Sequence, residues 1–143
     1  MKISTKGRYA LRVMIDLGNY SFSSSVSLSD IAKRQQISVK YLEQIMRVLI
    51  KHGYVKSERG AHGGYQLAKE PSCYTVGDIL RAAEGSLAPI SCLEKGAEPC
   101  VMKEQCATIA FWQGLYDQVN QYVDSYTLED LMKQDAVVCV SQK

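Results

Sequence analysis

The sequence has 143 residues, of which 46% are hydrophobic and 22% charged, and its formal net charge is +2. This length suits one domain, or a small domain with an appendage, and the composition supports a buried core and excludes a globally disordered chain. Because the sequence contains neither an 18-residue apolar run nor a signal-peptide pattern, we expect a cytoplasmic protein that does not enter a membrane.

The charges are divided unevenly along the chain. Residues 1–70 hold 12 Lys and Arg against 5 Asp and Glu, whereas residues 71–143 hold 5 against 10. A basic first half beside an acidic second half indicates a module that binds a polyanion, followed by a separate effector region. Uneven solvated faces are the plainer alternative.

Three helices are expected in the basic half. The first begins at an N-cap, Ser4 or Thr5, and is expected to stop at Gly18. The second opens at Ser27 with the spacing of a capping box, and the third opens at Ser38. Apolar residues recur at i, i+3, i+4 and i+7 in the first and third helices, as Ala10, Val13, Met14, Leu17 and as Leu42, Ile45, Met46, Leu49. The second and third helices, joined by a tight turn, form a helix-turn-helix pattern.

A hairpin is expected directly after this pattern. Residues 54–58 and 65–68 alternate like strands, and the turn between them is Arg59-Gly60-Ala61-His62-Gly63-Gly64. Its glycines permit positive φ angles and a close approach of the backbone to a ligand. Helix-turn-helix plus hairpin is a winged helix, so we expect Arg59 to contact a DNA groove or phosphate. An ordinary solvated turn is the alternative.

The acidic half is expected to hold a short helix, 75–84, and a long one, 103–126. The apolar residues of the long helix step by three and four, like a heptad repeat: Ile109, Trp112, Tyr116, Val119, Val123 and Tyr126. Such a helix is roughly 33 Å long, and a chain this small has few elements to cover it. We therefore expect a homodimer, with packing on the chain's own winged unit as the alternative.

These elements predict a mainly α fold with a small β-hairpin wing. The expected parts are a winged helix-turn-helix DNA-binding domain at 1–85, a cysteine loop at 86–107, a dimerisation helix at 103–126 and a C-terminal tail at 127–143.

Three of the five cysteines, Cys92, Cys100 and Cys106, lie within 15 residues. An odd number of cysteines without a secretory signal argues against a disulfide framework. Thiolates are soft ligands, and three of them so closely spaced can converge on one iron–sulfur cluster. Zinc binding and thiol-based redox sensing are the alternatives. Cys73 and Cys139 are expected to be buried, inert side chains.

Several segments, in this order, resemble the family of winged-helix transcription regulators that includes IscR, NsrR and CymR, and its IscR-type branch in particular. They are MKISTKGRYALRVMIDL at 1–17, the helix-turn-helix and wing at 28–69, YTVGDILRAAEG at 74–85 and the cysteine triplet. The resemblance implies a bacterial, cytoplasmic, homodimeric repressor of iron–sulfur biogenesis genes. It also implies an operator of double-stranded DNA and a bound iron–sulfur cluster, which we expect to be 2Fe–2S, with 4Fe–4S as the alternative.

The resemblance assigns DNA contacts to the first helix, the recognition helix and the wing. Arg59 matches a residue that enters the minor groove. Glu43 matches an acid that tunes which operators are tolerated, since a carboxylate accepts from cytosine N4 but repels phosphates. The residues so assigned are Ser4, Thr5, Arg8, Tyr9, Ser38, Lys40, Tyr41, Glu43, Gln44, Arg59 and Gly60.

The same resemblance makes the three cysteines cluster ligands. IscR-type proteins commonly add a histidine three residues after the last cysteine, and that position here is Ile109. The fourth ligand stays open between a residue of the partner chain, an exogenous thiol and one of three carboxylates, Glu94, Glu98 or Glu104.

No catalysis and no small-molecule substrate are expected, because phosphate-loop, serine-elbow and paired-histidine motifs are missing from the sequence. A regulator of the same fold that responds to thiol redox, nitric oxide or zinc is the nearer alternative. An iron–sulfur carrier or assembly factor that docks proteins through the winged unit is the alternative from another functional class.

Overall fold

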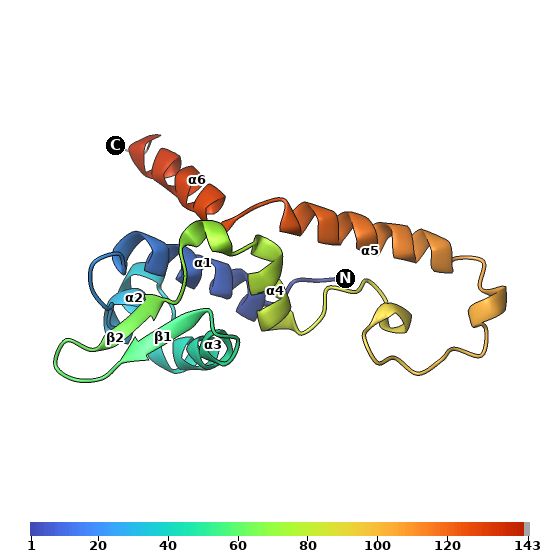
Figure 1. Cartoon of the computed structure of the whole chain (residues 1–143), viewed down its shortest axis with the longest axis horizontal. Coiled ribbons are helices and arrows are strands. Elements are labelled where there is room, and N and C mark those ends of the chain that lie inside the picture. The colour runs from blue at the N-terminus through green and yellow to red at the C-terminus, as the bar shows by residue number, and fades with distance from the viewer. Residues whose placement is uncertain (142–143) are drawn as a thin grey trace.

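The computed structural model of the chain describes the backbone of residues 1–141 and the side chains of residues 1–135. Its elements in chain order are α1 (Thr5–Tyr20), α2 (Leu28–Gln35), α3 (Val39–Lys51), β1 (Val55–Glu58), β2 (Gly64–Leu67), η1 (Pro71–Cys73), α4 (Val76–Glu84), η2 (Ser91–Leu93), η3 (Lys103–Gln105), α5 (Ile109–Asp124) and α6 (Leu128–Ser141). The predicted fold class is confirmed. In Figure 1, α5 extends away from a body made of α1 to α4 and the hairpin, and α6 returns to that body.

The core of the body is formed by the apolar stripes of α1 and α3, as the periodicity predicted. Leu17 of α1 and Leu42 and Leu49 of α3 are fully buried. Side-chain caps begin the helices at the predicted places, since Ser4, Ser27 and Ser38 accept hydrogen bonds from backbone N–H groups in the first turns of α1, α2 and α3. The caps and stripes together fix where each helix of the helix-turn-helix begins and which face it buries.

The wing is an antiparallel pair in which Val55 lies opposite Leu67 and Glu58 opposite Gly64. Val26 extends this small sheet by one bridge, because its N–H donates to the Tyr65 carbonyl at 2.9 Å and its own carbonyl accepts from Tyr65 N–H at 2.8 Å. The hairpin is thereby held against the loop before α2, so its position relative to the helix-turn-helix is fixed.

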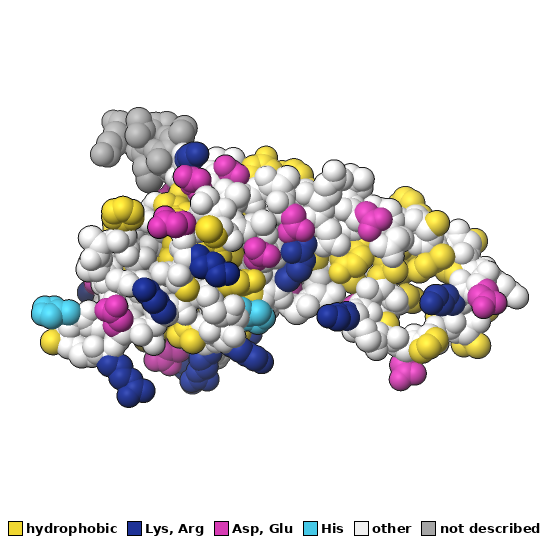
Figure 2. Space-filling view, in the orientation of Figure 1, with side chains coloured by type: hydrophobic (Ala, Val, Ile, Leu, Met, Phe, Trp, Pro, Cys, Tyr) yellow, Lys and Arg dark blue, Asp and Glu magenta, His cyan; other side chains and the backbone are white. Residues whose placement is uncertain are grey.

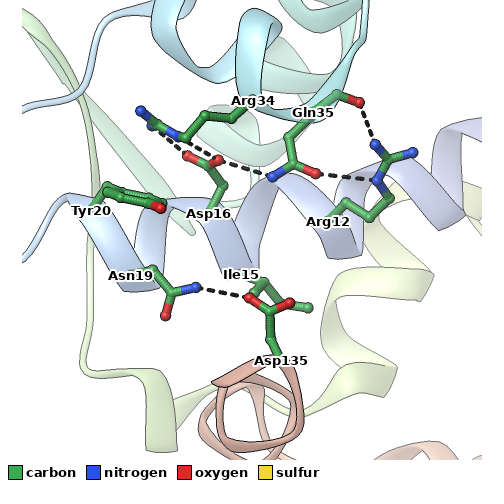
Figure 3. Close-up of a pocket in the computed structure, with 8 residues that line it drawn as sticks. All are labelled: Arg12, Ile15, Asp16, Asn19, Tyr20, Arg34, Gln35 and Asp135. Atoms are coloured by element: carbon green, nitrogen blue, oxygen red, sulfur yellow. Dashed lines mark hydrogen bonds and ion pairs between the residues drawn. The ribbon is translucent and has the colours of Figure 1, made fainter. Parts of the chain in front are cut away.

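A buried carboxylate ties α1 to α2 (Figure 3). Asp16 is 1% exposed and accepts three hydrogen bonds from α2: from Arg34 Nε at 2.9 Å, from Arg34 Nη2 at 2.8 Å and from Gln35 Nε2 at 2.9 Å. Arg12 of α1 in turn donates to the side chain of Gln35 at 3.2 Å and to its backbone carbonyl. Tyr20 lies under the Arg34 guanidinium, 4.0 Å from ring centroid to Cζ. Two neighbouring helices are thus locked in one orientation.

Replacing Asp16 with alanine is expected to lower the free energy of unfolding by about 2–3 kcal/mol, because it leaves donors of Arg34 and Gln35 without their acceptor. This value lies below the roughly 3–5 kcal/mol of a broken, fully buried ion pair, since the Arg34 side chain is 31% exposed. Urea unfolding followed by circular dichroism measures the change. Asp117→Ala, on the exposed face of α5, is the control and should change stability by less than about 0.5 kcal/mol. Equal stabilities for the two variants would contradict the locking role.

The predicted end of the first helix at Gly18 is wrong, because α1 continues to Tyr20. Gly18 instead lets α6 approach: a Cβ at this position would lie 2.5 Å from Met132 Sδ. Leu128 of α6 is fully buried, and Thr127 and Asp130 cap this helix reciprocally, with N–H to side-chain oxygen distances of 2.9 and 3.1 Å. The last helix therefore belongs to the core of the body, a role that the apolar pattern did not predict.

The long helix is shorter than predicted. It begins at Ile109 rather than near residue 103, because Cys106 has extended backbone that separates the 3-10 turn η3 from α5. Its apolar residues are only partly buried, and Phe111 and Tyr122 are 66% and 64% exposed. Within the described residues, α5 thus has no fully buried residue and leaves part of its apolar surface uncovered. Over the same residues, no helix combines the length and the apolar character that crossing a membrane requires.

Candidate DNA interface and cysteine site

The residues predicted to contact DNA on α3 and in the wing lie on one side of the body. Lys40, Glu43 and Gln44 are exposed on α3, and Arg59 is exposed in the loop between the strands. Figure 2 shows Lys and Arg side chains gathered along the edge where α3 and the wing lie, with acidic side chains among them. The structure therefore places the polar face of α3 and the wing turn on one basic surface, as a DNA groove would require.

Two tyrosines assigned to DNA contacts also have a packing role. The rings of Tyr9 on α1 and Tyr41 on α3 meet edge to face, with centroids 5.9 Å apart, and both are half-buried. Arg12 Cζ lies 4.9 Å from the Tyr9 centroid. Such pairs contribute roughly 0.5–1.5 kcal/mol beyond the area that they bury. Tyr9 and Tyr41 thus pack α1 against α3 and leave only part of each ring exposed.

The wing turn presents Arg59 and Gly60 to solvent. Gly60 has φ +108°, which L side chains rarely adopt, and an added Cβ would have no atom within 4 Å. The glycine is therefore required by the backbone of the turn and not by crowding. It allows the chain to bend directly after Arg59, the exposed residue that follows the end of β1.

At the start of α1, a carboxylate accepts hydrogen bonds from Ser4, one of the residues that the resemblance assigned to DNA contacts. Ser4 donates to Glu84 Oε1 from its backbone N at 3.0 Å and from its Oγ at 2.6 Å. Glu84 is the last residue of α4, and Gly85 then ends that helix before the cysteine segment. Thr5 and Arg8 remain exposed on the first turns of α1. Ser4 thus joins α1 to α4, and this contact between residues 80 positions apart has no signal in the sequence pattern.

The three cysteines of the triplet line one hollow of about 400 Å³, at the end of α5 farthest from the body. Cys92 lies in η2, Cys100 in the irregular segment after it, and Cys106 just before α5. Cys92 and Cys100 are exposed and Cys106 is half-buried, and all three are free thiols. The other residues around the hollow are Leu93, Ala97, Glu98, Pro99, Lys103, Ile109 and Gln113.

This donor set fits an iron–sulfur cluster, because three soft thiols face one space and the segment that bears them is open to solvent. Over residues 1–135, no group of three or more His, Cys, Asp or Glu side chains is already gathered closely enough to hold a metal ion. The segment must therefore close around any bound group. Cys106 Sγ lies 3.6 Å from Thr108 Oγ1, and accepting hydrogen bonds from Thr108 lowers the pKa of the Cys106 thiol. The lower pKa favours the thiolate, which is the form that binds metal.

The remaining cysteines do not join the triplet's hollow. Cys73 is exposed in η1, so its predicted burial is wrong: the short turn at Pro71–Cys73 leaves the thiol at the surface while the next residue, Tyr74, is buried. The prediction for Cys139 falls on a side chain outside the described residues.

A second ion pair joins the two helices that flank the cysteine segment. Arg81 of α4 donates to the Asp124 carboxylate of α5 at 2.8 and 2.9 Å and to Asn120 Oδ1 at 3.0 Å. Hydrogen bonding to Arg81 lowers the pKa of Asp124. Gly77 allows this closeness, since a Cβ there would lie 2.0 Å from Asp124 Oδ1. The ion pair therefore joins α4 to the last residue of α5, at the end opposite the cysteine segment.

Replacing Asp124 with asparagine is expected to lower stability at pH 7 by less than about 1 kcal/mol, because both partners are about a third or more exposed. The folded-state pKa of Asp124 is depressed, so its stabilisation exists above the unfolded value of about 3.9 and is lost as pH falls through the folded pKa. The difference between wild type and Asp124→Asn should therefore shrink as pH falls below the unfolded value of about 3.9 and disappear once pH has fallen below the folded pKa. Thermal unfolding across this range tests it, with Asp117→Asn as the control. A difference that persists at low pH would contradict the assignment.

Comparisons with known proteins find the same organisation. The Rrf2 family model, described as an iron-dependent transcriptional regulator, matches residues 3–134. Protein rrf2 of Nitratidesulfovibrio vulgaris is 42% identical over 140 residues, which cover 97% of this chain and 91% of that protein. The HTH-type transcriptional regulator CymR of Bacillus subtilis is 44% identical over 131 residues, 92% of this chain and 89% of CymR.

Two solved structures are similar over nearly the whole chain. The structure of CymR (YrzC), described as the global cysteine regulator of B. subtilis, matches with a TM-score of 0.75 at 40% identity and covers 94% of this chain and 98% of its own. That of T. potens IscR matches with a TM-score of 0.74 at 39% identity, over 94% and 88%. The named relatives are regulators and not enzymes, and they lend no support to the iron–sulfur carrier alternative.

Proposed function

Because the chain belongs to the Rrf2 family of transcriptional regulators, we propose that it binds a double-stranded DNA operator as a homodimer under the control of an iron–sulfur cluster. Cys92, Cys100 and Cys106 would hold the cluster, which is 2Fe–2S in this proposal. The regulator acts in the cytoplasm as a repressor of iron–sulfur biogenesis genes. The observation that supports the proposal is the single hollow that the three thiols share, lined by the cysteine segment and the first turns of α5.

A bound cluster would supply a redox-sensitive link among three thiolates. The chain's own residues carry the consequence to the DNA. The cysteine segment ends at α4 on one side and at α5 on the other, and Arg81 with Asp124 ties these two helices. Glu84 then joins the end of α4 to Ser4 at the start of α1. Closing the segment therefore acts on the helix that contacts the recognition helix through Tyr9 and Tyr41.

In the homodimer, two such bodies read successive major grooves about 34–36 Å apart. Each α5 pairs with its counterpart through the apolar residues that the single chain leaves uncovered. A cluster shifts operator affinity only by its different affinity for the two arrangements, typically 1–3 kcal/mol or about 5- to 150-fold.

A thiol-redox regulator of the same fold is the second candidate. The lowered pKa of Cys106 favours it, because a thiolate reacts with oxidants more readily than a thiol. One relative, CymR, is described as a cysteine regulator. Analysis of protein-bound iron and inorganic sulfide separates the two candidates, since a thiol-redox regulator contains neither.

Replacing Arg59 with alanine is expected to weaken operator binding about tenfold or more, the loss of a good groove contact. Fluorescence anisotropy with duplex DNA at several salt concentrations measures both affinity and the number of phosphate contacts. Lys133→Ala removes an equal charge from α6, on the side of the body away from the wing, and should leave affinity unchanged. If Arg59→Ala and Lys133→Ala bind equally well, the wing has no part in recognition.

A further inference from the structure

Only one of the three carboxylates near the cysteines lies at the shared hollow. Glu98 lines it together with Cys92, Cys100 and Cys106. Glu94 lines a neighbouring hollow of about 360 Å³, where Cys92 is the sole member of the triplet. Glu104 is exposed in η3 and lines neither of these two hollows. The structure thereby distinguishes carboxylates that the sequence spacing leaves equivalent.

The hollow offers few other ligands. Ile109 lines it, at the position where a histidine would complete the shell. His52 lies at the end of α3, with its ring 5.9 Å from that of Tyr54, and His62 lies in the wing turn. Gln113 also lines the hollow, but its amide is neutral and donates to Asp117 at 2.9 Å. An anionic oxygen is the stronger ligand for iron.

The backbone around Glu98 favours joint placement with Cys100. Pro99 follows Glu98 directly and restricts its backbone to extended conformations. In extended chain, residues i and i+2 point to the same side, which agrees with both side chains lining one space. Ordering Cys100 on an iron therefore also orders the Glu98 carboxylate at little added entropic cost. Lys103, at the same hollow, supplies a cation beside three thiolates and a carboxylate.

We propose that the Glu98 carboxylate is the fourth ligand of the cluster, so that the site is three thiolates and one carboxylate from a single chain. This inference rests on the proposed function. A carboxylate is a harder ligand than thiolate or imidazole, so it favours ferric over ferrous iron and leaves one iron more easily displaced. The cluster should accordingly be released more readily to chelators than an all-thiolate cluster.

Reconstitution with iron and sulfide under anaerobic conditions tests the ligand. Glu98→Ala should change the absorption and reduced-state electron paramagnetic resonance spectra and lose iron to a chelator at least tenfold faster than wild type. Glu98→Cys should keep the cluster, release it more slowly than wild type and show the spectrum of an all-thiolate site. Glu94→Gln and Glu104→Gln, which lie within six residues of the same position, should match wild type in every readout.

The possible failures are distinguishable. If wild type binds iron and sulfide and Glu98→Ala has the same spectra and chelation rate, Glu98 is not a ligand and the proposed function stands. If Glu94→Gln alone alters the spectra, the ligand is Glu94. If wild type binds no cluster, both the ligand and the proposed function are overturned. Thermal unfolding of each apo-protein checks that the exposed segment tolerates these changes.

Discussion

Replacing Val119 with glutamate is expected to convert the proposed dimer into a monomer and to lower operator affinity by about a hundredfold or more. Val119 lies in the middle of the apolar face of α5, between Tyr116 and Val123, and this face is only partly covered by the rest of the described chain. In a two-fold interface a central residue meets its own counterpart, so the variant brings two carboxylates together in an apolar contact.

The loss in operator affinity follows from the loss of bivalent binding, in which the two protomers contact two half-sites at once. A monomer contacts one half-site, whereas linking two reading heads typically raises affinity by about 10²–10⁴-fold. Sedimentation equilibrium gives the oligomeric state and anisotropy gives the affinity. Gln121→Glu adds the same charge on the opposite, exposed face of α5 and is expected to remain a dimer. A dimeric Val119→Glu protein with unchanged operator binding would remove α5 from the dimer interface.

The second large effect is expected at the cysteine hollow. Cys100→Ala should lose essentially all bound iron and sulfide, because two thiols and one carboxylate cannot complete the ligand set of a cluster. The operator affinity of this variant should no longer respond to iron chelation. Elemental analysis and absorption spectroscopy on anaerobically purified protein measure the first effect, and anisotropy with and without chelator the second.

Cys73→Ala is the matched control, since Cys73 is also an exposed free thiol but lies in η1, outside the hollow. It should retain wild-type iron, sulfide and operator response. A Cys100→Ala protein that kept its cluster, or a Cys73→Ala protein that lost it, would show that the hollow is not the binding site.

The elements that sequence patterns predicted are those governed by local rules. Side-chain caps at Ser27 and Ser38 and the apolar stripe of α3 depend on residues a few positions apart, so they can be read directly from the chain. The wing was predictable for the same reason, since alternation and a glycine-rich turn are both local signals.

What escaped prediction depends on contacts between distant residues. Gly18 has the local signal of a helix end, and its actual role, a close contact with Met132, depends on a residue 114 positions away. The hydrogen bonds from Ser4 to Glu84 and from Arg34 to Asp16 likewise join residues that no periodic pattern relates. A signal for α6 did exist in the capping pair Thr127 and Asp130. The choice of Glu98 over its neighbours likewise required knowing which side chains share the hollow.

Control of operator binding by a cluster is tested most directly on the wild-type protein. The protein is purified anaerobically and divided, metal is removed from one half with a chelator, and the operator affinity of both halves is measured. If a cluster controls operator binding, the protein is coloured and contains iron and inorganic sulfide, and the operator affinities of the two halves differ by at least about fivefold. A colourless or zinc-loaded protein, or a cluster whose removal leaves operator affinity unchanged, would contradict this control.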